Sequence, residues 1–184
     1  MDENILSVRE LQEKDIEQLT NYWLNSSDAF LTGMGVDLTK MPAREQWAEM
    51  LGGQLKQHYN EKKSYGIIWL LDGQPIGHSN VNKIIFGEEA YMHLHIWDEE
   101  IRKKGLGNAY IKMTIPYFFE NLQLKKLCCE PYALNEAPNR TLAKAGFSFV
   151  SEYITTPGWL NFEQPVKLWE MSAERFRRFR SLEV

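Results

Sequence analysis

One stretch in the middle of the chain, residues 90–122, constrains the fold more than any other. An alternating segment, Ala90–Asp98, precedes a basic turn with two glycines, and a long, mostly apolar segment, Ala109–Leu122, follows that turn. Alternation with a period of two predicts a strand, and the long apolar segment predicts a helix. We therefore expect a strand, a short turn and a helix in direct succession.

The turn itself, residues 102–108 (RKKGLGN), has the chemistry of an anion-binding site. Gly105 and Gly107 have no Cβ, so the backbone can adopt positive φ and approach a ligand closely. The start of the following helix offers free N–H groups and the positive end of a dipole, which hold phosphate groups. The turn is not a P-loop, because no Gly-Lys-Ser/Thr closes it, and Tyr110 takes the third glycine position of a dinucleotide fingerprint. Taken alone, a basic turn with two glycines would favour a solvated connection between a strand and a helix over a binding site.

Length and composition favour a single domain spanning residues 1–184. Hydrophobic residues make up 43% of the 184 residues and charged residues 25%, close to globular averages. The net charge of −4 argues against general nucleic-acid binding through a basic surface. The basic cluster in the turn is therefore local and suited to a small anion.

The cysteines and the apolar segments indicate in which cellular compartment the protein is expected. Cys128 and Cys129 are adjacent, and adjacent cysteines rarely pair, so we expect a reducing cytoplasm. No apolar run follows a basic start, so we expect no signal peptide. No run reaches about 18 apolar residues, so we expect no membrane span.

The rest of the chain is typical of short strands and helices. Before the central stretch we expect a strand at Ile5–Glu10, a helix from an Asp15 cap to about Asn25, a loop at Ser26–Met41, a helix from Pro42 to about Tyr59, and strands at Ser64–Leu71 and Pro75–Phe86 joined by an Asp72-Gly73 hairpin turn. After it we expect a strand at Lys126–Glu130, a helix at Asn135–Ala145 ending at Gly146, and strands at Phe147–Ile154 and Val166–Met171. The aromatic connection between the last two strands is long enough to suggest a function.

Two segments, in this order, resemble a known family. The turn matches the Q/R-x-x-G-x-G/A pyrophosphate loop of the GCN5-related N-acetyltransferases (GNAT), and Asn135–Phe147 resembles their N-x-A-S-N-x-x-x-x-K-x-G-F segment. The match covers about Ser64 to Met171 and is most similar to the branch that includes the ribosomal-protein N-terminal acetyltransferases. The resemblance implies an α+β fold: a mixed, mostly antiparallel sheet flanked by helices and split between its fourth and fifth strands.

The resemblance also implies an N-acetyltransferase with acetyl-CoA bound in that split. The backbone of the fourth strand would pair with the pantetheine arm and polarise the thioester carbonyl. The turn would hold the pyrophosphate, and an asparagine, assisted by a second, would bind the arm. The implied residues are His95, Ile96 and Trp97 in the strand, Arg102, Lys103, Lys104, Gly105, Leu106, Gly107 and Asn108 in the turn, and Asn135 with Asn139 for the arm.

Two residues are candidates for the base that takes a proton from the acceptor amine. Glu130 ends the expected fifth strand and occupies the position of the general-base glutamate in the ribosomal-protein enzymes that the chain resembles. His93 aligns with a base-supplying histidine of arylalkylamine acetyltransferases, and histidine is the natural proton acceptor near neutral pH. The choice stays open, because Glu130 could be a surface carboxylate at a strand end and His93 could pair structurally with His95.

The usual donors of a proton to the leaving thiolate are missing. Leu142 stands where many family members have tyrosine, and Pro138 stands where the related branch often has serine. Tyr132, Tyr153 or water could serve instead. These departures motivate an alternative function, a non-catalytic acyl-CoA-binding or sensor domain on the same fold. A nucleotide-phosphate enzyme is disfavoured because the Walker residues are missing.

The acceptor is expected between the N-terminal helices and the aromatic connection. Aromatic side chains there would line the site and carboxylates would attract a cation, which favours a small amine, an amino-acid derivative or a protein N-terminus. The aromatic residues are Phe30, Trp47, Trp159 and Phe162, and the carboxylates are Asp28, Asp37 and Glu163. We expect no metal, because His78, His93 and His95 fit no zinc spacing. We also expect no nucleic-acid or membrane partner, and a monomer or homodimer.

Overall fold

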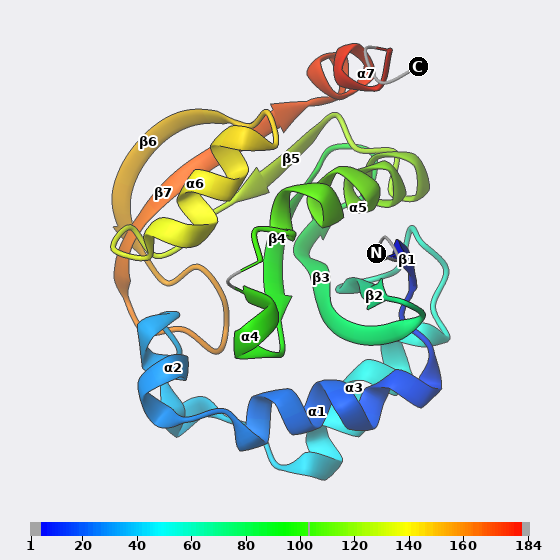
Figure 1. Ribbon diagram of the computed structural model, residues 1–184. Coiled ribbons are helices and arrows are strands. Elements are labelled where there is room, and N and C mark those ends of the chain that lie inside the picture. The colour runs from blue at the N-terminus through cyan, green and yellow to red at the C-terminus, as the bar shows by residue number, and fades with distance from the viewer. Residues whose placement is uncertain (1–4, 103, 182–184) are drawn as a thin grey trace.

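The computed structural model describes residues 5–102 and 104–181, which build a seven-stranded sheet flanked by helices (Figure 1). The strands are β1 (Leu6–Glu10), β2 (Tyr65–Leu71), β3 (Gln74–Ile85), β4 (Glu89–Ile96), β5 (Lys126–Cys129), β6 (Ser148–Thr155) and β7 (Gln164–Ser172). Their order in the sheet is β1-β2-β3-β4-β5-β7-β6, and neighbours are antiparallel except for the parallel pair β4 and β5. This confirms the mixed, mostly antiparallel α+β fold expected from the sequence.

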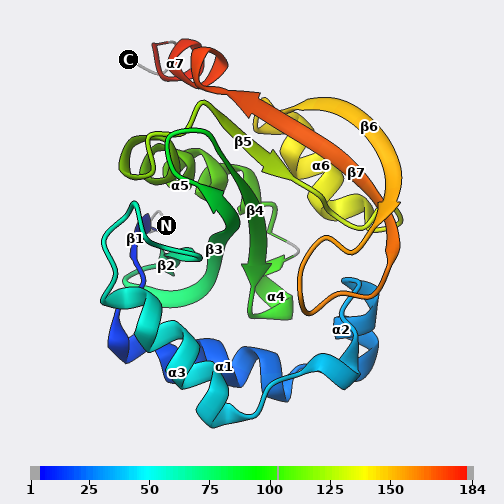
Figure 2. The same ribbon diagram turned by 180° about the vertical axis from the view of Figure 1, so that it is seen from behind.

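The helices gather on two sides of this sheet. They are α1 (Ile16–Asn25), α2 (Asp28–Gly33), α3 (Arg44–Leu55), α4 (Glu99–Arg102), α5 (Gly107–Asn121), α6 (Glu136–Lys144) and α7 (Ala173–Ser181), with 3₁₀ segments η1 (Glu13–Asp15) and η2 (Leu38–Lys40). Helices α1, α2 and α3 lie together at the bottom of Figures 1 and 2. Helices α5 and α6 lie on the other side, near the region where β4 meets β5.

Several local features differ from the sequence prediction. The expected loop at Ser26–Met41 contains α2 and η2, and the hydroxyl of Ser27 caps α2 by accepting the Phe30 N–H at 3.3 Å. Helix α3 ends at Leu55 rather than near Tyr59. A short helix that the sequence did not predict, α4, precedes the glycine turn and ends at its first residue, Arg102.

Asp15 precedes α1 as predicted, but its side chain does not cap that helix. The buried carboxylate accepts hydrogen bonds from the Arg9 guanidinium at 2.6 and 2.7 Å and from the Gln12 N–H at 2.9 Å. A paired charge and a backbone donor satisfy this buried group better than a cap alone. The start of α1 is thereby fixed to β1.

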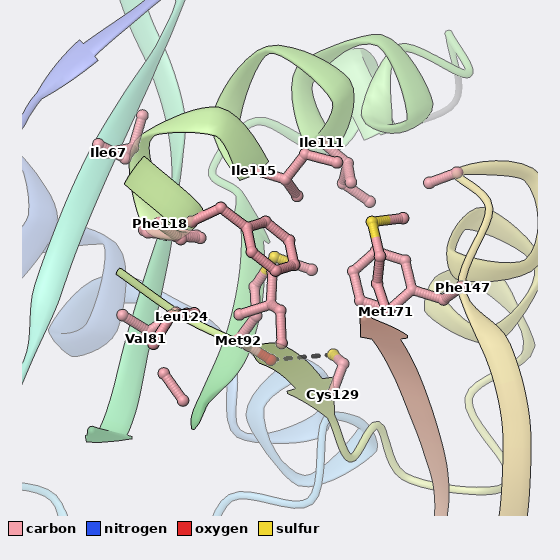
Figure 3. Packing of buried hydrophobic residues seen from close by; sticks show 14 of the residues in the cluster. Ile67, Val81, Met92, Ile111, Ile115, Phe118, Leu124, Cys129, Phe147 and Met171 are labelled. Atoms are coloured by element: carbon pink, nitrogen blue, oxygen red, sulfur yellow. Dashed lines mark hydrogen bonds between the residues drawn. The ribbon is translucent and has the colours of Figure 1, made fainter. Parts of the chain in front are cut away.

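The main hydrophobic core lies between α5 and the sheet (Figure 3). Ile111, Ile115 and Phe118 of α5 pack over the junction of β4 and β5. The buried Cys129 thiol of β5 donates to the Met92 carbonyl of β4 at 2.9 Å, which links the two strands at this junction. Leu142 is also fully buried in this core, so its position offers no polar group to a ligand.

The opposite face of the sheet packs on the N-terminal helices. Side chains alternate along β4, so Met92 points toward α5 while His93 points toward α1 and α3. A second apolar cluster forms on this face from Leu19, Tyr22, Trp23, Leu31, Val36, Trp47 and Leu160. The two faces of β4 therefore serve different purposes: one carries the core and the other faces the N-terminal helices.

Replacing Gly146 with alanine should destabilise the fold. Gly146 has φ +89°, and an added Cβ would lie 2.2 Å from the Phe179 ring of α7. Left-handed backbone costs a non-glycine residue roughly 1–2 kcal/mol, so we expect the melting temperature to fall by roughly 2–8 °C. Thermal unfolding followed by circular dichroism measures this. Gly53→Ala, in the interior of α3 with open space at the Cβ position, is the control and should not lower the melting temperature. An unchanged melting temperature for Gly146→Ala would contradict a left-handed, closely packed backbone at this position.

Candidate active site

Strands β4 and β5 pair only from Glu89 with Lys126 to Tyr91 with Cys128. Beyond this point the two strands diverge (Figure 2), so one edge of β4 runs on without a strand partner. Backbone groups point to alternate sides along a strand. The Met92 carbonyl points toward β5, because it accepts from Cys129, and by alternation Leu94 and Ile96 present their backbone groups to the same open edge.

The open edge differs by one residue from the sequence-based expectation. The Trp97 N–H donates to the Ile76 carbonyl of β3 at 2.9 Å, and His95 lies opposite His78 in the β3 register. Of the expected residues His95, Ile96 and Trp97, only Ile96 faces the gap. Leu94 joins it there, and the alternation of β4 relative to the parallel β5 pairing is the signal that identifies it.

The glycine turn has the predicted local geometry. Gly105 has φ +72°, no atom of the described residues lies within 4 Å of a Cβ placed on it, and α5 begins at Gly107. The first-turn N–H groups of a helix have no partner within the helix. In this turn the side-chain oxygen of Asn108 is buried and has no hydrogen-bond partner in the described part of the chain. A buried polar atom of this kind fits a ligand that brings a donor. Leu106, between the two glycines, packs its side chain against the main core.

The basic residues of the turn are not equivalent. Arg102 donates from Nε to the Ile96 carbonyl at 2.9 Å and from Nη2 to the Trp97 carbonyl at 3.0 Å. Its guanidinium also lies 3.7 Å from the centre of the Phe30 ring. Arg102 thus fixes the end of β4 to α2. The sequence had suggested instead that its side chain extends into the turn. Lys104 is exposed, and Lys103 lies outside the described residues.

The two predicted asparagines also differ. Asn139 is buried, and its amide donates to the Tyr132 and Asn135 carbonyls at 3.2 and 2.7 Å and accepts from Trp169 Nε1 at 2.8 Å. These bonds occupy both ends of the amide, so Asn139 anchors the start of α6 to β7. Asn135 precedes α6, and its side chain makes no capping hydrogen bond.

A cavity of about 470 Å³ lies beneath β2, β3 and β4. Helices α1 and α3 and the segment 158–161 form its other walls. Trp47 and Trp159 line it, as the sequence predicted. Phe30 and Phe162 do not: Phe30 packs on Arg102, and Phe162 lies 6.2 Å from Tyr132, measured between ring centres.

The predicted acidic residues do not line this cavity either. Asp28, Asp37 and Glu163 are absent from its walls, and the Asp37 carboxylate accepts hydrogen bonds from the hydroxyl and N–H of Thr39. The sequence therefore located the cavity between the correct elements but assigned it the wrong charge.

Three histidines from β3 and β4 face the cavity, and burial keeps each of them neutral. Burial lowers the pKa of His78 to about 3 and that of His93 to about 4, and it holds the pKa of His95 well below its usual value. His78 Nδ1 accepts from Trp97 Nε1 at 2.8 Å, and His95 Nδ1 lies 3.1 Å from the Tyr22 hydroxyl.

His93 differs from its two neighbours. Its Nε2 is buried and has no partner among the described residues. A neutral imidazole has one nitrogen that can accept a hydrogen bond. His93 is therefore the histidine of the three best placed to receive a proton from a ligand.

Glu130 follows β5 and is not the solvated carboxylate that the sequence left open. Its side chain is 6% exposed, forms an ion pair with Lys83 at 3.2 Å and accepts a hydrogen bond from the Tyr153 hydroxyl. Burial and this hydrogen bond raise the pKa of the Tyr153 phenol, so Tyr153 keeps its proton. Glu130 lies outside the cavity walls, although Asn82, the neighbour of Lys83, lies within them.

Two features are absent from residues 5–102 and 104–181, the part of the chain that the structure describes. No three His, Cys, Asp or Glu side chains in these ranges come together as the ligands of a metal ion would. No helix in the same ranges is long and apolar enough to cross a membrane.

The split sheet, with a glycine turn leading into α5, defines the acyl-CoA N-acyltransferase fold. A family model described as "Acetyltransferase (GNAT) domain" matches residues 6–148. The chain therefore belongs to the GNAT acetyltransferase family, whose acetyl donor is acetyl-CoA. A search of the curated proteins found no match.

Several solved structures share this fold. Aminoglycoside acetyltransferase AAC(6')-Ib with coenzyme A and kanamycin has a TM-score of 0.73 at 19% identity, over 96% of this chain and 99% of that one. Spermidine N-acetyltransferase from Vibrio cholerae with CoA and spermine has 0.75 at 15%, over 94% and 98%. The ribosomal L7/L12 α-N-protein acetyltransferase RimL with coenzyme A has 0.74 at 14%, over 92% and 95%. These similar values do not single out the ribosomal-protein branch, which stays a prediction.

Proposed function

We propose that this chain transfers an acetyl group from acetyl-CoA to an amine held in the cavity beneath β4, by direct attack in a ternary complex. The observation that carries the proposal is that both sites share one strand. The open edge of β4 at Leu94 and Ile96 suits the donor, and His93, which directly precedes Leu94 in sequence, faces the cavity. Adjacent surfaces of one strand would hold both substrates in a fixed relation, which supplies much of the rate of a two-substrate reaction.

Acetyl-CoA supplies the activated thioester, and the residues around the split fit its parts. The backbone of Leu94 and the N–H of Ile96, whose carbonyl already accepts from Arg102, would hold the pantetheine arm together with the Asn135 side chain. The backbone N–H groups of Gly105 to Asn108, with the exposed charge of Lys104, would hold the pyrophosphate. We keep Lys103 as a further candidate, and we assign Arg102 and Asn139 to the positioning of these elements.

We propose His93 as the acceptor of the amine proton. The amine nitrogen gains positive charge as it attacks the thioester carbonyl, and its N–H group becomes acidic at that moment. A neutral imidazole with a low pKa can then accept this proton. The C–S bond breaks, and the CoA sulfur leaves as a thiolate that takes its proton from water.

Glu130 is the second candidate for this role. Its carboxylate pairs with Lys83 and accepts from the Tyr153 hydroxyl, and it could accept the proton only through a bridging water, since it lies outside the cavity walls. Tyr153 is its hydrogen-bond donor and could return a proton to the thiolate. The kcat values of the His93→Leu and Glu130→Gln variants distinguish the two candidates.

Charge reversal at Lys104 tests the pyrophosphate assignment. Lys104→Glu should weaken acetyl-CoA binding by roughly 5- to 20-fold, because one exposed charge near a phosphate contributes about 1–2 kcal/mol on reversal. Isothermal titration calorimetry at low salt measures the dissociation constant. Lys14→Glu, an exposed lysine in η1, is the matched control and should leave it unchanged. Equal effects of the two variants would count against the turn as the pyrophosphate site.

Release of free thiol from acetyl-CoA tests the proposed activity itself. The protein should release thiol only when a suitable amine is present. Acetyl-CoA binding without thiol release across a panel of small amines, amino-acid derivatives and peptides would instead favour the non-catalytic acyl-CoA-binding or sensor domain.

A further inference from the structure

We infer that the acceptor of this chain is a compact monoamine with an apolar, aromatic body, and not a polycation such as a polyamine or an aminoglycoside. The inference rests on the proposed function for the location of the acceptor, and it adds the chemical class. Three properties of the cavity carry it: the charge of its walls, their shape and the polar atoms that they leave without partners.

The ionisable groups of the walls do not suit a polycation. Among the described wall residues, Glu10 is the only one with a carboxylate, and Lys62 and Lys63 carry ammonium groups. The formal charge of the cavity walls is therefore not negative. The Glu10 carboxylate already accepts from the Tyr59 and Tyr65 hydroxyls and from Asn121. A buried cation needs a paired charge to offset its lost hydration, and these walls offer no free carboxylate for a second or third ammonium group.

The three neutral histidines add to this effect. His78, His93 and His95 lie on the sheet wall, and burial prevents them from gaining charge near neutral pH. The burial that keeps these imidazoles uncharged also disfavours a charged ammonium group in the same cavity. The amine should therefore react in its neutral form.

The opposite wall is aromatic and flat. Trp23 and Trp47 stack with ring centres 5.6 Å apart and an interplanar angle of 9°. Trp159 lies 5.8 Å from Trp47, inclined at 51°, and is half exposed at the mouth. Such surfaces bind an aromatic ring through stacking and apolar burial. The cavity volume of about 470 Å³ lies in the lower part of the range for small-ligand pockets, roughly 300–1,000 Å³.

Three buried polar atoms in these walls have no partner among the described residues. Asn82 Oδ1 and His93 Nε2 can accept hydrogen bonds, and Trp47 Nε1 can donate one. Unpaired buried polar atoms are rare in folded proteins and need an explanation, and a ligand in the cavity that bonds to these three atoms would supply one. Asn80 lies opposite His93 in the β3–β4 register, and Asn82 is two residues further along the same face.

These atoms predict the polar pattern of the ligand. The two acceptors, Asn82 and His93, suit the two N–H bonds of a neutral primary amine at the sheet. The donor, Trp47 on α3, suits an oxygen on the body of the same molecule. An arylalkylamine with a ring hydroxyl has this pattern: an amine, an apolar ring and a hydroxyl oxygen.

The test compares tyramine with spermidine and kanamycin. We expect the kcat/KM of tyramine to exceed that of either polycation by at least about 100-fold, which corresponds to about 2.7 kcal/mol. Binding is measured separately, from quenching of tryptophan fluorescence in the complex of the protein with CoA, because Trp23, Trp47 and Trp159 line the cavity.

Substitutions at Asn82 sharpen this test. Asn82→Leu should weaken tyramine binding by roughly tenfold, because the amine loses a hydrogen-bond acceptor. Asn82→Asp should raise the activity with spermidine relative to tyramine by roughly tenfold, because it adds a carboxylate to the wall. Asn60→Asp adds the same charge at an exposed position outside the wall and should leave the ratio unchanged.

The outcomes separate this inference from the proposed function. Tyramine that is bound and acetylated supports both. Tyramine that is bound but not acetylated supports the ligand class and contradicts acetyl transfer. A higher kcat/KM for spermidine or kanamycin overturns the inference while the transferase activity stands. Failure of tyramine to bind the CoA complex also overturns it.

Discussion

Replacing His93 with leucine is expected to lower kcat roughly 100-fold, the lower end of what a positioned proton acceptor contributes. His93 faces the cavity with a buried Nε2 that has no partner among the described residues. Because leucine has a similar size, the cavity should keep its shape. Because leucine cannot accept a proton, the catalytic step should slow. The donor site lies on the edge of β4, so the dissociation constant of acetyl-CoA should stay within about twofold, well under the 1.4 kcal/mol of a tenfold change. Steady-state kinetics and calorimetry measure the two quantities.

Glu130→Gln is the matched comparison, because it keeps the size of the side chain and removes its charge. Glu130 lies outside the cavity walls, so its loss should reduce kcat less than the loss of His93. A larger decrease for Glu130→Gln would transfer the role of base to Glu130 and leave His93 as a structural residue.

The pH profile gives an independent readout of the same assignment. Because burial lowers the pKa of His93 to about 4, its neutral form is present throughout the range above that pH. The kcat/KM of the native protein should therefore keep rising from pH 6 toward the pKa of the amine. A plateau that begins near 6.5, the pKa of an ordinary histidine, would contradict a buried His93.

Much of the fold could be predicted because each strand carries a local signal. The Asp72-Gly73 turn adopts positive φ at both residues, 49° and 76°, as a type I′ hairpin requires. Gly146 has the left-handed conformation expected after a helix. The misses have a common cause: the Asp15 and Tyr59 side chains form hydrogen bonds with Arg9 and Glu10 of another element, β1, and no local sequence pattern reveals such partners.

The candidate site was predictable to the level of elements but not of individual groups. Period-two alternation correctly placed His93 and His95 on the same face of β4. It did not reveal that Arg102 would turn back onto the carbonyls of β4, or that Asn139 would bond to Trp169. The charge of the cavity was mispredicted because the positions of Asp28 in α2 and of Asp37 before η2 do not reveal which way their side chains point.

The buried histidines should also make the protein sensitive to mild acid. Each of the three has a folded-state pKa below the ordinary value of about 6.5, so the unfolded chain binds more protons as the pH falls. Their contribution to stability is fully present above that value and is lost as the pH falls toward the folded pKa. Between pH 6.5 and 5, the contribution of each histidine to the free energy of unfolding should fall by roughly 2 kcal/mol, because one pH unit corresponds to about 1.36 kcal/mol per proton.

The free energy of unfolding from urea titrations at pH 7.5 and pH 5 measures this loss, which should reach several kcal/mol for the three histidines together. The window lies above the usual pKa of most carboxylates, so the histidines dominate it. His78→Asn keeps an acceptor for Trp97 Nε1 but cannot titrate, and it should reduce the pH dependence by about a third, since it removes one of three such groups. His58→Asn, at the exposed histidine, should leave it unchanged. Equal stability at both pH values would mean that these imidazoles are solvated, and would remove the argument for a neutral, apolar acceptor cavity along with it.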